Sequence, residues 1–173
     1  MYRSKKIVLV SHCILNQNSV VHPCGRNMSN FKKLLTKIIG NNIGIIQLPC
    51  PEISLYGVKR WGHVKDQFNT PHFKKQSKKL IENIIDNVID YKNNGYEILG
   101  VIGIKGSPSC GVTVTCLGNW YGEVGGWDMK NKLETLEEGK EPGVFMEILK
   151  ESLIEIGTDV EFYDNFERFV ETL

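Results

Sequence analysis

Three short runs of apolar and β-branched residues alternate with helix-like segments, and this alternation constrains the fold more than any other feature of the chain. The runs are Lys6–Val10, Ile43–Leu48 and Tyr96–Ile104. Continuous apolar runs of this length are typical of strands that are buried on both faces. Because helices between such strands imply parallel βαβ crossovers, we expect an α/β chain with a mainly parallel sheet and helices on both of its faces.

The helices are predicted from apolar residues that recur every three or four positions. Such stripes lie between Phe31 and Ile39, between Leu80 and Ile89, and between Val144 and Ile156, and the second predicts a long helix from about Thr70 to Asn94. A short strand is predicted around Val160–Tyr163 after the last helix. Glycine and aromatic residues alternate across Leu117–Asp128, which predicts a loop or a short hairpin near the edge of the sheet.

Length and charge narrow the possibilities further. The chain has 173 residues, so we expect residues 1–173 to form a single domain. The net charge of +1 does not favour a nucleic acid as partner. No apolar run approaches the roughly 18 residues that a membrane span needs, and the apolar start is too short for a signal peptide. We therefore expect a cytoplasmic protein without a membrane partner; the oligomeric state stays open.

Three of the five cysteines follow directly after the three predicted strands. Cys13, Cys50 and Cys110 each lie in a short loop rich in Pro, Gly or Ser. In a parallel sheet the carboxyl ends of the strands share one edge, where ligands bind. We therefore expect these three thiols to converge, although they are far apart in the sequence.

Convergent thiols at an open sheet edge suggest a metal or iron–sulfur centre. Three thiolates leave a tetrahedral metal or a cluster incomplete by one ligand, which is the layout of a catalytic centre with an open position. A single cysteine at a strand end is more often simple packing. We interpret Cys116 in this way, whereas Cys24 stays open as a fourth ligand, a resolving thiol or neither.

The same residues resemble a known family. The motifs Ser-His-Cys13-Ile-Leu-Asn, Cys50-Pro-Glu52 and Gly-Ser107-Pro-Ser109-Cys110-Gly, in this order, resemble the thiouracil desulfurase family and its desulfidase-like relatives. The resemblance implies a Rossmann-like three-layer fold and a [4Fe–4S] cluster held by only three cysteines, which here are Cys13, Cys50 and Cys110. It also implies that the fourth iron is free to take the sulfur of a thiocarbonyl substrate, such as a thiolated pyrimidine base.

The resemblance also suggests roles for other residues. It places the catalytic carboxylate on Glu52 and the catalytic serine on Ser107 or Ser109. Glu52 is the natural general base for water, although the sequence leaves open whether Lys105 or Arg60 keeps it ionised. Asn16, Arg60 and Lys105 are our candidates for binding the substrate.

Two loops depart from the family pattern. They are Asn16–Arg26 and Ile53–Gly62, and both should line the substrate pocket, so the identity of the substrate stays open.

The function predicted from the sequence is an iron–sulfur-dependent desulfidase that removes sulfur from a small thiolated compound without a redox step. Water attacks the thiocarbonyl carbon with assistance from Glu52, and the open iron makes the enzyme sensitive to oxygen. The alternatives are a non-catalytic sulfide or metal carrier, a zinc site, or a thiol-redox protein that uses the same cysteines. Zinc usually takes a fourth protein ligand, and the Cys-x-x-Cys pattern of thiol oxidoreductases is missing from the sequence.

Overall fold

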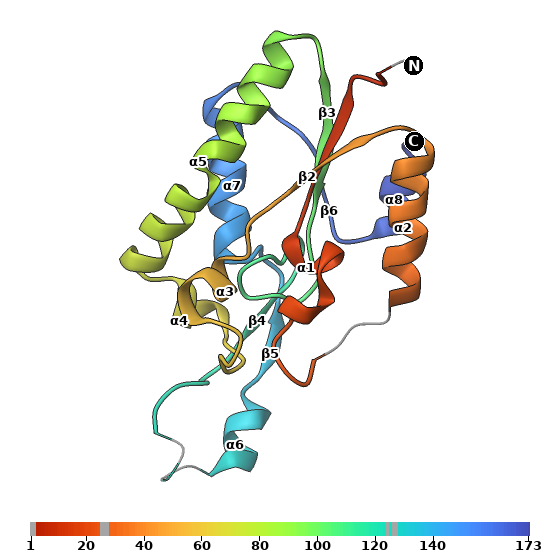
Figure 1. Cartoon of the computed structure of the whole chain (residues 1–173). Helices are drawn as coiled ribbons and strands as arrows, with labels where there is room; N and C mark the ends of the chain where they lie inside the picture. Colours follow the sequence, from red (N-terminus) through yellow and green to blue (C-terminus); the bar gives the residue numbers. More distant parts are fainter. Residues whose placement is uncertain (1–2, 25–27, 124, 126–127) are drawn as a thin grey trace.

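The central sheet has four parallel strands in the order β2-β1-β3-β6 (Figure 1). This computed structural model describes residues 3–24, 28–123, 125 and 128–173. The strands are β1 (Lys6–Val10), β2 (Gly44–Gln47), β3 (Glu97–Ile102) and β6 (Phe162–Tyr163). The predicted parallel sheet is confirmed: β1 has the predicted bounds, and the other three strands are slightly shorter than their apolar runs. Arg26, which ends the first of the two divergent loops, lies outside the described residues.

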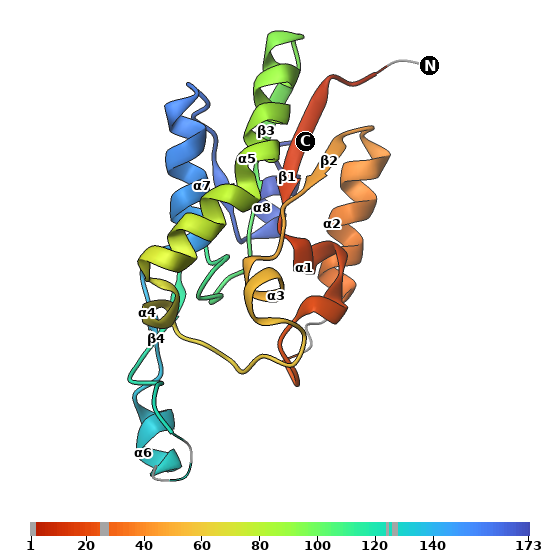
Figure 2. The same ribbon diagram turned by 60° about the vertical axis from the view of Figure 1, so that its left-hand side comes forward.

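Helices cover both faces of this sheet. Their bounds are α1 His12–Leu15, the 3₁₀ helix η1 Gln17–Ser19, α2 Met28–Gly40, α3 Pro51–Tyr56, α4 Lys65–Phe68, α5 Pro71–Asn93, α6 Met129–Glu134, α7 Val144–Glu155 and α8 Phe166–Val170. In Figures 1 and 2, α2 and α8 lie on one face, and α5 and α7 on the other. The predicted three-layer α/β fold is confirmed. Within the described part of the chain, no helix has the length and apolar character to cross a membrane.

The central strand β1 shows why the layers form. Ile7 and Leu9 belong to the core cluster that includes the buried residues of α5 and α7, whereas Val8 and Val10 belong to the cluster on the side of α2 and α8. All four side chains are at most 4% exposed. Successive side chains of a strand point to opposite faces, so a continuous apolar run requires cover on both sides.

The connections set the place of the site. The chain leaves β1 for β2 on one side and later returns to β3 on the other side of β1. The order of the strands therefore reverses between β1 and β3. In open α/β sheets this reversal, at the carboxyl ends of the strands, is where ligands bind.

A small arm was only partly predicted. Strand β4 (Thr115–Leu117) pairs antiparallel with β5 (Glu137–Gly139), and α6 lies between them. The arm projects beyond the carboxyl end of the main sheet (Figures 1 and 2). The sequence predicted a loop or hairpin within Leu117–Asp128, of which residues 124, 126 and 127 lie outside the described residues. The hairpin spans a longer segment than predicted, and α6 was not predicted.

A buried lysine of α4 forms ion pairs with a glutamate at the end of the arm and with a glutamate at the start of α7. The side chain of Lys65 is 6% exposed, and its Nζ donates to Glu141 Oε2 at 3.0 Å and to Glu147 Oε1 at 2.6 Å. Burial by itself would lower the pKa of Lys65, but the hydrogen bonds and charges of Glu147 and Glu141 outweigh it, so the pKa is raised.

Replacing this lysine should therefore destabilise the fold. We expect Lys65→Met to lower the free energy of unfolding by about 1–3 kcal/mol at pH 7, because two carboxylates lose their shared cation. Denaturant unfolding measures the change, with the exposed Lys79→Met expected within about 0.5 kcal/mol of the wild type. Since the folded pKa is raised, the contribution is complete below the unfolded lysine pKa of about 10.4 and disappears as the pH rises through the folded pKa. An unchanged unfolding free energy in Lys65→Met would contradict this assignment.

Candidate active site

The three cysteines lie just beyond the carboxyl ends of three adjacent strands. Cys13 lies in α1 after β1, Cys50 precedes α3 after β2, and Cys110 lies in the loop after β3. Burial raises the pKa of the Cys110 thiol well above its usual range, and the neighbouring charges of Cys13, Glu52 and Cys50 raise it further. The hydrogen bond from Ser109 acts in the opposite direction. All three predicted thiols and the predicted carboxylate therefore lie in one neighbourhood.

Among the described residues, no three His, Cys, Asp or Glu side chains are arranged to hold one metal ion. A mononuclear zinc ion needs its donors within about 2.0–2.3 Å of a single point. An iron–sulfur cluster instead takes its thiolates at separate irons, so the cysteines surround it. Three thiols from the ends of three separate strands supply the kind of donor set that such a cluster takes.

Cys50 acts as the N-cap of α3. Its Sγ accepts a hydrogen bond from Ile53 N at 3.5 Å, and Pro51 occupies the first helical position. Burial raises the pKa of the Cys50 thiol, whereas the Ile53 N–H lowers it. The cap fixes the direction of the thiol and places Glu52 in the first turn of the helix.

The loop that carries Cys110 rests on the N-terminus of α7. Val144 N donates to Pro108 O at 3.2 Å, while Phe145 N and Met146 N donate to Ser109 O at 3.0 and 3.2 Å. The first N–H groups of a helix have no partner within the helix, and α7 has no side-chain cap. The carbonyls of the loop supply these missing partners, which holds the loop in a fixed position.

Glu52 is held at both carboxylate oxygens. Ser109 Oγ donates to Oε1 at 2.6 Å, and Arg60 Nε donates to Oε2 at 2.9 Å. The Glu52 side chain is 13% exposed and that of Arg60 is 4% exposed. Ser109 also lies 3.6 Å from Cys110 Sγ, so the hydroxyl links the carboxylate to a thiol.

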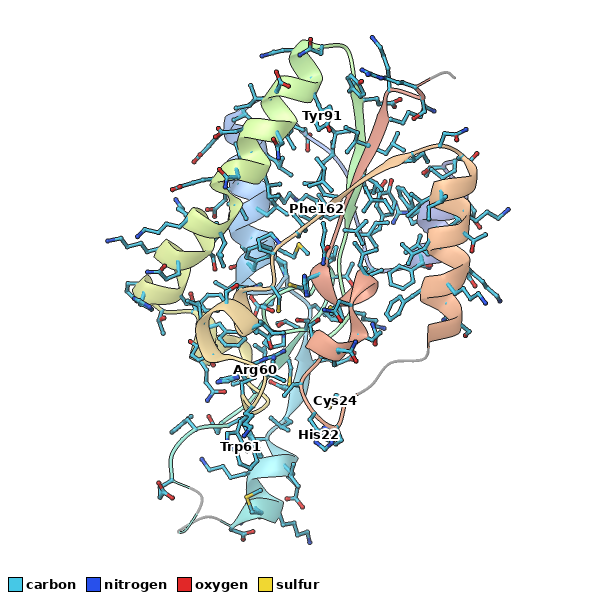
Figure 3. All side chains as sticks on the ribbon, in the orientation of Figure 1. His22, Cys24, Arg60, Trp61, Tyr91 and Phe162 are labelled. Atoms are coloured by element: carbon cyan, nitrogen blue, oxygen red, sulfur yellow. The ribbon has the colours of Figure 1, made fainter. Side chains whose placement is uncertain are left out.

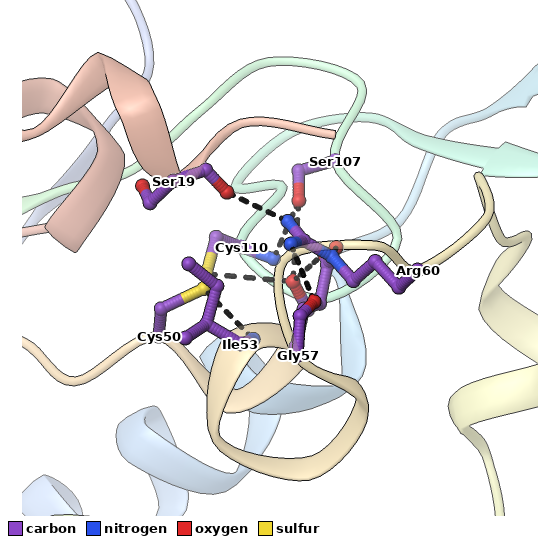
Figure 4. Close-up of polar contacts among 9 residues, drawn as sticks. Ser19, Cys50, Ile53, Gly57, Arg60, Ser107 and Cys110 are labelled. Carbon is purple, nitrogen blue, oxygen red and sulfur yellow. Dashed lines mark hydrogen bonds and ion pairs between the residues drawn. The ribbon is translucent and has the colours of Figure 1, made fainter. Parts of the chain in front are cut away.

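Ser107 belongs to the same group but plays a different part. Its Oγ accepts a hydrogen bond from Cys110 N at 3.0 Å and lies 3.3 Å from Ser109 Oγ. Figure 4 shows these contacts around Cys50, Cys110 and Arg60. Of the two serines that the motif offered, only Ser109 has a recorded hydrogen bond to Glu52.

Arg60 lies at the centre of this network. Besides its contact with Glu52, its Nη1 donates to Gly57 O at 3.3 Å and its Nη2 to Ser19 O at 2.8 Å (Figure 4). In Figure 3, Arg60 lies far from Tyr91 and near Trp61. The sequence suggested Arg60 as a substrate ligand or as the partner of Glu52, and its recorded contacts are to protein groups.

The other two candidates for binding substrate are exposed. Asn16 is exposed, and its Oδ1 accepts from Asn18 N at 3.1 Å. Lys105 is exposed and lines a cavity of about 1120 Å³ between α2 and α8. This cavity is lined by charged and polar residues of both helices and the nearby loops, among them Ser29, Lys33, Lys37, Thr113, Asp164 and Glu167. The proposed roles of Asn16 and Lys105 in binding substrate stay predictions.

His63 is a further neighbour of Glu52. Its ring packs 5.1 Å from Tyr56 and 4.8 Å from Phe68, between ring centroids. Burial lowers the pKa of His63, while the Glu52 charge raises it. Its position depends on the fold of the loop between α3 and α4, which shows no periodicity in the sequence.

The remaining cysteines differ in their surroundings. Cys24 is exposed, and Cys116 is half-buried on β4. The position of Cys116 in a strand agrees with its interpretation as a packing residue. The role of Cys24 stays open.

Comparison with known proteins agrees with the motifs. A family profile described as "Putative 2-thiouracil desulfurase" matches residues 5–124. The chain is also 41% identical, over 110 residues, to an uncharacterised protein of Methanocaldococcus jannaschii. The matched segment covers 64% of this chain and 70% of that relative. No solved structure matches the chain.

The contact between α7 and the Cys110 loop can be tested at Gly143. A Cβ atom at this position would lie 2.5 Å from the carbonyl carbon of Ser109 and 2.8 Å from Pro108 O. We expect Gly143→Ala to lower the free energy of unfolding by about 1–3 kcal/mol, because backbone on both sides must shift. Gly40→Ala is the matched control, since its Cβ would meet nothing within 4 Å. Equal stabilities of the two variants in denaturant unfolding would show that the loop does not depend on this close approach.

Proposed function

The chain belongs to the 2-thiouracil desulfurase family, and on this premise we propose that it replaces the sulfur of a small thiocarbonyl compound by oxygen. A thiolated pyrimidine base is the substrate class that the family's description suggests. The observation that carries the proposal is that Ser109 Oγ donates to Glu52 at 2.6 Å and lies 3.6 Å from Cys110 Sγ, at the edge of the sheet to which the strands also bring Cys13 and Cys50. Thiols that could bind a metal centre thus lie close to a carboxylate that could take a proton from a water molecule.

The cofactor that we propose is a [4Fe–4S] cluster with Cys13, Cys50 and Cys110 as its ligands. The donor set supports this choice, because three thiols approach one end of the sheet from three separate strands. When bound, such a cluster supplies an iron without a protein ligand, and this iron can polarise the thiocarbonyl sulfur as a Lewis acid. Ser107 and Ser109 offer hydroxyl groups near the Cys110 ligand.

The protein groups account for the movement of protons. Glu52 Oε1 accepts a proton from a water molecule, whose oxygen attacks the thiocarbonyl carbon. The carbon–sulfur bond then breaks, the sulfur leaves with the electron pair of that bond, and it takes up the proton held by Glu52 and the proton that remained on the attacking oxygen. Water and the thiocarbonyl compound thus give a carbonyl compound and hydrogen sulfide, with no net oxidation or reduction. Ser109 and Arg60 hold the two carboxylate oxygens in place during these steps.

The contact between Ser109 and Glu52 favours an enzyme over a sulfide or metal carrier. A carrier needs thiols but no general base, whereas here a carboxylate is oriented by a hydroxyl at 2.6 Å beside a proposed ligand. The carrier and thiol-redox alternatives predict thiol chemistry that does not depend on Glu52.

The ligand assignment can be tested by metal analysis. We expect the wild-type protein, reconstituted without oxygen, to hold about four irons and four sulfides per chain. Cys13→Ser, Cys50→Ser and Cys110→Ser should each lose most of this content, because a hydroxyl is a poor iron ligand. Cys116→Ser is the matched control and should keep it. A full cluster in any of the first three variants would remove that cysteine from the ligand set.

The role of the carboxylate can be tested by Glu52→Gln. The amide keeps the shape of the side chain but cannot take a proton from water, so we expect turnover of 2-thiouracil to fall about 10²–10⁴-fold. Sulfide release and uracil formation measure the rate, and the absorption of the cluster should stay unchanged. Undiminished turnover in this variant would contradict the proposed mechanism.

A further inference from the structure

We propose that Arg60 is a positioning residue that holds the Cys13 and Cys50 segments together across the site and orients Glu52 for its reaction. The second half of this inference rests on the proposed function, whereas the first half concerns the protein alone. Arg60 lies outside the cysteine motifs, in a loop that departs from the family pattern.

The side chain of Arg60 turns into the protein although its neighbour is exposed. Its guanidinium-bearing side chain is 4% exposed, whereas Trp61 is 77% exposed. A buried charge is costly unless it is paired and hydrogen-bonded. Here Glu52 supplies the opposite charge and two backbone carbonyls accept further hydrogen bonds.

The carbonyl that accepts from Nη2 belongs to the segment that carries Cys13. Ser19 lies at the end of η1, is 2% exposed, and donates from its own Oγ to Asn16 O at 2.6 Å. In the same segment the side-chain amide of Gln17 donates to the carbonyl oxygen of Cys13. Hydrogen bonds within this short segment therefore connect Ser19, which Arg60 contacts, to the backbone of Cys13.

The other two contacts belong to the segment that carries Cys50. Glu52 lies in the first turn of α3, directly after the Cys50 cap, and Gly57 is the C-cap of the same helix. Arg60 therefore contacts both ends of α3 with Nε and Nη1, while Nη2 reaches across to η1. A lysine could neutralise Glu52, but a single ammonium cannot reproduce the planar fork that serves three acceptors.

The experiment measures the approach of the two thiols directly. The full chain, without metal and in a Cys24→Ser/Cys116→Ser background, is treated with a short bis-maleimide, and the Cys13–Cys50 cross-link is quantified by peptide mass spectrometry. We expect the cross-linked fraction to fall about fivefold in Arg60→Ala and nearly as far in Arg60→Lys, because neither variant can bridge the segments. Arg168→Ala is the matched control, since this arginine is 67% exposed and contacts Glu161 away from the site.

A second variant separates positioning from loss of stability. Arg60→Ala leaves Glu52 as an uncompensated buried charge, which by itself destabilises a fold. The double variant Glu52→Gln/Arg60→Met removes both charges, and we expect it to fold but to keep the low cross-linked fraction. The proposal would be overturned if the cross-linked fraction of this double variant or of Arg60→Ala equalled that of the wild type. It would also be overturned if the wild type did not form the cross-link.

Turnover gives a further readout on the loaded enzyme. If Arg60 acts through Glu52, Arg60→Lys should lower kcat about tenfold or more and leave KM within about twofold, and added guanidinium should partly restore kcat in Arg60→Ala. A raised KM with unchanged kcat would instead assign Arg60 to substrate binding and overturn its positioning of Glu52. The cross-link needs neither cluster nor substrate. It therefore tests whether Arg60 bridges the two segments even if the protein proves to have no desulfidase activity.

Discussion

Parallel pairing of β1 with β2 on one side and β3 on the other is the constraint on which the rest of the structure depends. It brings the segments that follow these strands, which carry Cys13, Cys50 and Cys110, to one edge of the sheet. The pairing is secured by the burial of β1 on both faces, where four consecutive side chains from Ile7 to Val10 pack into the two cores. The position of the site is thus a consequence of the hydrophobic core rather than of contacts among the cysteines.

The sheet brings the segments of the site together, and polar contacts then fix the orientation of the individual side chains. The first turn of α7 satisfies its own N–H groups with carbonyls of the Cys110 loop, and Cys50 caps α3 with its sulfur. Glu52 is held by a hydroxyl at one oxygen and a guanidinium at the other. Each of these contacts satisfies a buried polar group and also orients a group of the proposed reaction. Stability and chemistry therefore depend on the same hydrogen bonds at this edge of the sheet.

The sequence allowed the sheet and the meeting of the three cysteines to be predicted, because apolar periodicity locates strands and helices and the βα order locates their ends. It offered Arg60 and Lys105 as possible partners of Glu52 but could not decide between them, since the loop between α3 and α4 has no period that fixes where a side chain points. The burial of Lys65 was not predicted either, because its partners Glu141 and Glu147 lie far along the chain. Helix α6 is short and entirely unburied, so it lacks the apolar stripe by which helices are recognised.

We propose that the three cysteines around this edge leave one iron of a cluster open to the sulfur of the substrate. Mössbauer spectroscopy of protein reconstituted with iron-57 under anaerobic conditions, with and without 2-thiouracil, tests this most directly. The account predicts a [4Fe–4S] signal in which one iron site differs from the others and changes when 2-thiouracil is added. A cluster whose iron sites are all indifferent to 2-thiouracil, or the lack of any cluster after competent reconstitution, would contradict it.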